Sequence, residues 1–133
     1  MSKWLIAYAA TVVAVAALDL LWLGVVAKPW YQGALGHLLA AKPNFFAALV
    51  FYLVFALGLM VFALAPNAGA HGWTAVLIAA AWFGFFTYAT YDLTNLATLR
   101  DWPLAITLVD IAWGIVISVL AASAGRLAMN QVG

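Results

Sequence analysis

Four apolar blocks occupy nearly the whole chain and constrain its fold more than any other feature. They cover residues 4–27, 44–65, 72–98 and 103–124. A helix that crosses the hydrocarbon core of a bilayer needs ~20 apolar residues, so each block is long enough to span it. The chain has 69% hydrophobic and 7% charged residues, whereas soluble domains carry about 25% charged residues. We therefore expect an all-α integral membrane protein, a single domain over residues 1–133 that forms a four-helix transmembrane bundle.

The segments between the blocks predict the connections. The second and third loops are short, so the helices that they join are expected to be antiparallel neighbours. The first loop is longer, and residues 30–41 lie between two prolines. Tyr31, Leu35 and Leu38 are spaced i, i+4 and i+7, which predicts a short helix lying in the membrane interface. The first and third loops hold three of the five basic residues, a bias that slightly favours these loops on the cytoplasmic side.

Charge and cysteine content exclude several classes of function. The five basic residues are scattered singly, and nothing resembles the basic stripe that a nucleic-acid partner would need. The chain contains no cysteine, which excludes disulfides, thiol nucleophiles and thiolate metal sites. The partners that remain are the lipid bilayer itself and other membrane helices, either in a homodimer or in a larger membrane complex.

Three of the four acidic residues lie inside the apolar blocks: Asp19, Asp92 and Asp110. A charged side chain at the centre of a membrane helix costs ~2.5–3.5 kcal/mol, so these aspartates are expected to face the protein interior or a wet cavity. At 1.5 Å per residue, each lies about 10–12 Å below the membrane surface that carries the first and third loops. We therefore predict one acidic layer shared by several helices.

Other polar and aromatic side chains reach the same level or share a helix face with an aspartate. Tyr52 lies eight residues into the second block, and an indole follows one turn after Asp19 and after Asp110. The candidate ligand- or ion-binding set is therefore Asp19, Asp92, Asp110, Tyr52, Tyr88, Asn95, Thr94, Trp22 and Trp113.

The predicted helices contain no basic side chain within reach of this layer. Close carboxylates do not all ionise without a cation, so they are expected either to hold protons or to share a bound ion. Oxygen ligands suit a hard cation such as Mg²⁺, Ca²⁺ or Mn²⁺, and Asp19, Asp92 and Asp110 are the candidate metal ligands if there is one. No cofactor is required by the sequence. The alternative is structural: protonated aspartates that only join helices through hydrogen bonds.

Small residues recur at four-residue steps, which predicts close helix packing. Ala80 and Gly84 follow this spacing in the third block, and Gly114, Ser118 and Ala122 follow it in the fourth. The same steps also arise by chance in alanine-rich helices.

One stretch, YATYDLTNLATLRDWP at residues 88–103, is fairly specific. Together with Asp19-x-x-Trp22, Phe51-Tyr52, Gly84 and Asp110-x-x-Trp113-Gly114, it resembles a family of small bacterial membrane proteins catalogued as domain of unknown function 2177. The resemblance covers nearly the full chain. It implies a multi-pass protein of the bacterial inner membrane with four helices, and it carries no established activity, so no catalytic role is transferred.

Three functions fit these observations. The first is a transporter-like or channel-like protein that binds or conducts a proton, a cation or a cationic solute at the aspartate layer. The second is an accessory or assembly subunit of a larger membrane complex. The third, which we favour least, is an intramembrane enzyme that uses two aspartates as acid and base on lipid or peptide. No residue is predicted to be catalytic.

Overall fold

The computed structural model describes residues 2–132, and within them every regular element is helical. In chain order the elements are α1 (Ser2–Leu21), a π-helical segment (Trp22–Val26), α2 (Lys28–Leu35), α3 (Phe45–Leu59), a second π-helical segment (Met60–Leu64), α4 (Thr74–Thr98) and α5 (Leu104–Val132).

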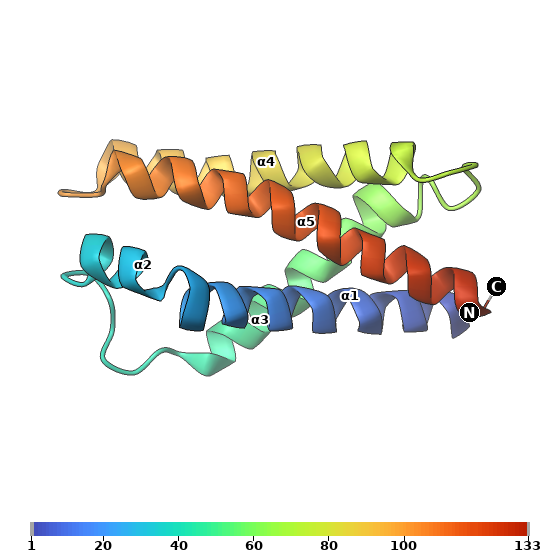
Figure 1. Ribbon diagram of the computed structural model, residues 1–133, viewed down its shortest axis with the longest axis horizontal. Coiled ribbons are helices and arrows are strands. Elements are labelled where there is room, and N and C mark those ends of the chain that lie inside the picture. The colour runs from blue at the N-terminus through green and yellow to red at the C-terminus, as the bar shows by residue number, and fades with distance from the viewer. Residues whose placement is uncertain (1, 133) are drawn as a thin grey trace.

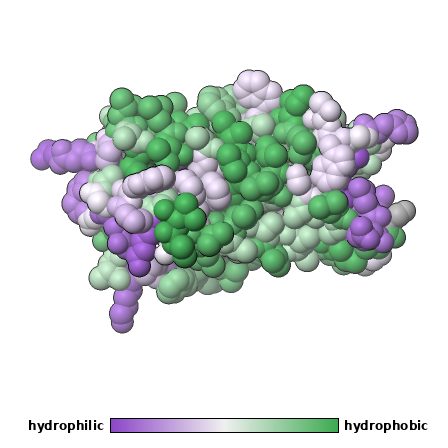
Figure 2. All heavy atoms as spheres, viewed as in Figure 1, coloured by the Kyte–Doolittle hydropathy of each residue, from purple (hydrophilic) through white to green (hydrophobic). Residues whose placement is uncertain are grey.

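Four continuous helices are long and apolar enough to cross a membrane. They are Ser2–Val26, Phe45–Leu64, Thr74–Thr98 and Leu104–Val132. Figure 2 shows hydrophobic side chains over the middle of the molecule and hydrophilic ones gathered at its two ends. An apolar belt between two polar ends is the surface that a bilayer requires. The prediction of an all-helical transmembrane bundle is therefore confirmed.

The helices do not all pack alike. α5 lies between α1 and α4 and packs against both, while α3 crosses the bundle diagonally (Figure 1). The middle of α3 packs on α1, where the Tyr52 hydroxyl donates a hydrogen bond to an α1 side chain and the Leu53 carbonyl oxygen accepts one. The π-helical segment Met60–Leu64 packs against α4. As a result α3 and α4 lie close together at the end that carries the loop between them and diverge toward the other end (Figure 1).

Close approach of α4 and α5 depends on small residues. A Cβ atom added to Gly84 would collide with the carbonyl oxygen of Gly114 and the side chain of Ser118. A Cβ atom on Gly114 would collide with the ring of Tyr88. The four-residue spacing of small side chains therefore serves packing, because the two backbones approach where no side chain intervenes.

The end of the last helix differs from the sequence-based expectation. α5 continues to Val132, whereas Gly125 and Arg126 suggested an end near residue 124. Gly125 instead lies against Thr11 and Leu64, where a Cβ atom would not fit. It is therefore a contact residue inside a helix and not a helix terminator.

The short helix of the first loop is α2, and it is more closely tied to the bundle than a helix lying on a membrane surface. Tyr31 and Leu35 are buried and form a small apolar cluster with Ala27 and Ile106. Leu38, the third residue of the predicted stripe, is exposed. The apolar face of α2 thus covers the end of the bundle where α3 and α4 diverge.

Candidate functional site

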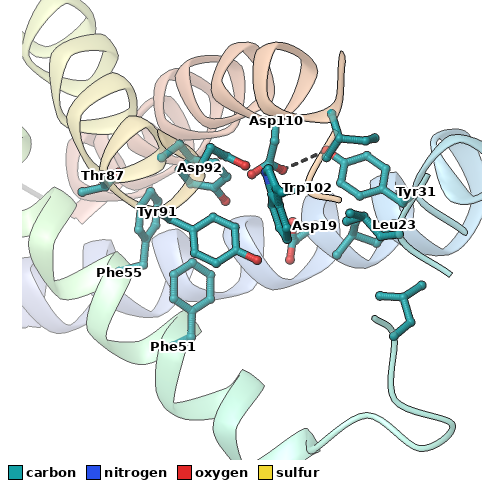
Figure 3. Close-up of a pocket in the computed structure, with 14 residues that line it drawn as sticks. Asp19, Leu23, Tyr31, Phe51, Phe55, Thr87, Tyr91, Asp92, Trp102 and Asp110 are labelled. Carbon is teal, nitrogen blue, oxygen red and sulfur yellow. Dashed lines mark hydrogen bonds between the residues drawn. The ribbon is translucent and has the colours of Figure 1, made fainter. Parts of the chain in front are cut away.

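A cavity of about 420 Å³ lies between the diverging helices, and every transmembrane segment and α2 contribute to its wall (Figure 3). The lining is mostly apolar and aromatic, and none of its side chains is basic. The lining residues are Asp19, Leu23, Tyr31, Leu35, Leu39, Phe51, Phe55, Thr87, Tyr88, Tyr91, Asp92, Trp102, Ile106 and Asp110.

The three intramembrane aspartates meet at this cavity. Asp19 comes from α1, Asp92 from α4 and Asp110 from α5 (Figure 3). Their exposed fractions are 8%, 0% and 8%, so none faces lipid. A carboxylate facing hydrocarbon would be costly, and the fold avoids this cost by turning all three inward.

Asp19 has a hydrogen-bond donor for each carboxyl oxygen. The Tyr52 hydroxyl donates to Oδ2 at 2.9 Å, and the indole nitrogen of Trp113 donates to Oδ1 at 3.3 Å. These donors come from α3 and α5. Both carboxyl oxygens of Asp19 are therefore used as hydrogen-bond acceptors within the protein.

Asp110 ends a short chain of hydrogen bonds that begins at the π-helical segment. The indole nitrogen of Trp22 donates to the Tyr31 hydroxyl at 3.2 Å, and this hydroxyl donates to Oδ1 of Asp110 at 2.8 Å (Figure 3). Burial of the hydroxyl is the main reason why the pKa of Tyr31 is raised above its ordinary value. Tyr31 therefore remains a donor at neutral pH.

Asp92 differs from the other two aspartates because neither of its carboxyl oxygens has a hydrogen-bond donor, although both are shielded from solvent. The carboxyl group of Asp110 lies beside it on the cavity wall (Figure 3). Two ionised carboxylates only repel, whereas one shared proton converts the contact into a hydrogen bond. The geometry therefore suits a proton held between Asp92 and Asp110.

Two aromatic side chains link the halves of the network. The rings of Trp22 and Trp113 are stacked, with centroids 4.5 Å apart and an interplanar angle of 7°. Trp113 contacts Asp19, and Trp22 contacts Tyr31 and through it Asp110. The stack fixes both indole donors and so orients the two aspartates relative to each other.

The predicted site residues divide into three groups. Asp19, Asp92, Asp110 and Tyr88 line the cavity, and Tyr52, Trp22 and Trp113 lie behind it as hydrogen-bond donors. The other two do not line it: Thr94 is exposed and donates to carbonyl groups of its own helix, and Asn95 is absent from the wall. Thr94 lies on another face of α4, two residues after Asp92, whereas Asn95, three residues after Asp92, lies near the same face but outside the cavity wall.

Several wall residues were not predicted from the sequence, above all Tyr31, Tyr91, Trp102 and Phe55. The sequence shows the apolar stripe that includes Tyr31. However, a helix that faces a membrane surface and one that faces a helix bundle have the same spacing of apolar residues. The Tyr91 ring packs edge-on against Trp102 at 5.9 Å, a contact that depends on the turn between α4 and α5. No local signal identifies such a pair.

One basic side chain is buried inside a long helix, far from the aspartates. Arg126 of α5 is buried, donates to the carbonyl oxygen of Ala70 at 3.0 Å and lies over the Trp73 ring. It is about 24 Å along α5 from Asp110. Arg126 therefore belongs to the opposite end of the bundle and does not neutralise the aspartates.

The three carboxyl groups are not arranged as a metal site. Within residues 2–132, no group of three or more His, Cys, Asp and Glu side chains could hold a metal ion. The cavity is better suited to a ligand that contacts one or two of the aspartates, with aromatic rings around the remainder of its surface.

The family assignment follows from the chain as a whole. Residues 4–127 match the model of a family described as predicted membrane protein, DUF2177. The chain belongs to this family. The match includes all three aspartates and both stacked tryptophans, so the resemblance noted from residues 88–103 is confirmed. No curated protein and no solved structure matches the chain.

Proposed function

We propose that this DUF2177 protein binds a cation or a cationic solute at the aspartate cavity in exchange for a proton, as a transporter-like membrane protein. The observation that carries the proposal is Asp92, a fully buried carboxyl group at a cavity wall whose two oxygens have no donor. A purely structural network would use these oxygens to join helices. At Asp19 and Asp110 the protein does supply donors, and at Asp92 it does not.

The charge of the site supports a positively charged ligand. Three aspartates surround a cavity whose lining contains no Lys, Arg or His. An anion there would face unpaired acids at low dielectric, where repulsion is strong. A cation would instead be attracted, and the faces of the tyrosine and tryptophan rings would add cation–π attraction.

Proton exchange follows from the surroundings of Asp92. The titratable groups around the cavity are Asp19 on α1, Tyr31 on α2, Asp110 on α5, and Tyr88 and Tyr91 on α4, with Tyr52 of α3 bonded to Asp19 behind the wall. All are acids. When a cation enters, the O–H bond of the shared Asp92–Asp110 proton breaks, the proton leaves to solvent, and the carboxylate pairs with the cation.

The experiment is a proton-release assay on the purified protein in nanodiscs of zwitterionic lipid, in weak buffer with a pH indicator. Methylammonium and Na⁺ are added as probes to the wild type and to Asp92→Asn, Asp110→Asn and Asp19→Asn. The proposal expects saturable proton release with at least one probe, and its loss in Asp92→Asn. Normal release in all three variants would refute it, and so would the absence of saturable release in the wild type.

A matched control is available outside the membrane helices. Asp101 is exposed in the turn before α5, with a φ angle of 62°. Asn accepts this backbone conformation well, so Asp101→Asn makes the same chemical substitution at an exposed position without backbone strain. Proton release should be unchanged in this variant. A loss there equal to that in Asp92→Asn would mean that the assay reports net charge and not the cavity.

A further inference from the structure

The wall of the cavity is incomplete on the side where α3 and α4 diverge. Phe51 of α3 and Tyr91 of α4 both line the cavity, and their exposed fractions are 42% and 55%. Deeper in the bundle Phe55 closes the gap, since its ring contacts Phe83 and Tyr88 at centroid distances of 5.2 and 5.9 Å. Phe51 and Tyr91 therefore form the rim of a lateral opening, with Leu39 and Leu23 exposed nearby.

The depth of this rim places it among acyl chains. Phe51 lies six residues after the first residue of α3, or about 9 Å along it, and Tyr91 lies about 10 Å before the end of α4. α4 has 25 residues, about 37 Å, whereas the hydrocarbon core is ~30 Å thick. The rim is therefore roughly 6 Å inside the hydrocarbon boundary, just below the lipid head groups.

The acidic groups of the cavity are gathered on one side. Asp19, Asp92 and Asp110 lie close together there, and the other walls are mostly aromatic and aliphatic (Figure 3). A volume of about 420 Å³ falls within the ~300–1,000 Å³ range of cavities that hold drug-sized ligands. The complementary ligand has one small cationic head and an apolar body.

Hydrogen bonding restricts the head further. A buried acceptor without a donor is costly, and a ligand that supplies donors removes that cost. A primary ammonium group has three N–H donors. It can bond Asp110 at the cavity surface and donate to the shielded oxygens of Asp92 when that side chain turns toward the cavity. A quaternary ammonium group has the same charge and no donor, so it would leave them unsatisfied.

We propose that the cavity takes a long-chain primary amine in its protonated form, which enters from the bilayer between α3 and α4. This inference rests on the proposed function and adds the ligand class and the route. The ammonium head pairs with Asp92 and Asp110 and releases their shared proton. The alkyl chain of the bound amine extends out of the cavity through the Phe51–Tyr91 opening and remains in contact with lipid.

The test uses the absence of cysteine from the chain. Phe51→Cys places a single thiol on the rim, and Val54→Cys places one on the lipid-facing side of the same helix, where the native side chain is 62% exposed and does not line the cavity. Both variants are labelled in nanodiscs of zwitterionic lipid with a lipophilic maleimide, with and without dodecylammonium. The inference expects labelling at residue 51 to slow about tenfold or more at saturation, and labelling at residue 54 to be unchanged.

Head-group controls separate recognition from partitioning into lipid. Dodecyltrimethylammonium and dodecyl sulfate enter bilayers through the same chain. The first should need at least about tenfold higher concentration to protect residue 51, a difference of ~1.4 kcal/mol, and the second should give no protection. Equal protection by all three probes, or protection that persists in Phe51→Cys combined with Asp92→Asn, would overturn the proposal.

The outcome for the route is distinguishable from the outcome for the proposed function. If methylammonium and dodecylammonium both release protons in an Asp92-dependent way, but residue 51 is not protected, the cation site stands and the lateral route is wrong. If neither probe releases protons and residue 51 is not protected, both proposals fail. Slower labelling at residue 54 equal to that at residue 51 would also refute the route.

Discussion

Replacing Asp92 with asparagine tests whether this carboxyl group serves stability or binding. Asn has nearly the same shape, and its amide group can donate a hydrogen bond to Asp110. In the wild type Asp92 has no hydrogen-bond donor apart from the proton that it shares with Asp110, and the amide group replaces that one bond. We expect Asp92→Asn to leave the free energy of unfolding unchanged or to raise it by up to about 1 kcal/mol, while proton release is lost.

The same substitution at Asp19 is expected to act in the opposite direction. Asp19 accepts hydrogen bonds from Tyr52 and Trp113 on separate oxygens, and an asparagine can accept only one of them. The lost bond leaves a buried donor unpaired. Hydrogen bonds between membrane helices contribute ~0.6 kcal/mol on average and up to ~1.7 kcal/mol, so Asp19→Asn should lower the free energy of unfolding by about 1–2 kcal/mol.

The measurement is reversible unfolding in mixed micelles with increasing SDS, followed by far-ultraviolet circular dichroism. Both variants replace one carboxyl oxygen with an amide nitrogen, so each is the control for the other. A loss of stability in Asp92→Asn as large as that in Asp19→Asn would refute the reasoning. It would mean that Asp92 joins helices and that its proton-sharing contact with Asp110 is structural.

Three further predictions follow from the surroundings of the cavity. Tyr31→Phe removes the 2.8 Å hydrogen bond to Asp110 and should lower the free energy of unfolding by about 1–2 kcal/mol in the SDS titration. The pKa of Tyr31 is raised above its ordinary value of 10.0. Its contribution to the free energy of unfolding is therefore complete below pH 10 and decreases as the pH rises above 10. Tyr31→Phe should lose less stability than the wild type over this alkaline range. Gly84→Leu should prevent folding or lower the free energy of unfolding by several kcal/mol, because the Gly114 backbone leaves no space for a side chain. A matched Phe86→Leu change on the exposed face of α4 should lower it little. Equal losses of stability in the two variants would contradict this explanation.

Most of the fold was predictable because its causes are local. Block length and composition determine which segments span the membrane, and helical rise converts sequence separation into depth, so Asp19, Asp92 and Asp110 could be placed at one level before any coordinates were known. The cavity that they surround was not predictable. It exists because α3 is tilted and diverges from α4 (Figure 1), and tilt is set by packing along the whole helix.

Residues with two possible environments were the least predictable. Tyr31 and Leu35 lie on one apolar face of α2, and such a face can pack either on a membrane surface or on a helix bundle. Gly125 indicated a helix end by its lack of a side chain, but the same property allows Thr11 to approach closely. In both cases the local pattern is compatible with two structures, and only the neighbouring helix decides between them.

The π-helical segment Trp22–Val26 has a consequence for how this chain tolerates insertions and deletions. In this segment the Ala27 amide donates to the Trp22 carbonyl oxygen at 2.7 Å, so the turn holds one residue more than an α-helical turn. Deleting a single residue there would turn this contact into an ordinary α-helical hydrogen bond to the same carbonyl oxygen, so the residues that follow would keep their positions. Tyr31 would still face Asp110, whereas a one-residue deletion in the regular turns of α1 would rotate all that follows by about 100° and separate Tyr31 from Asp110.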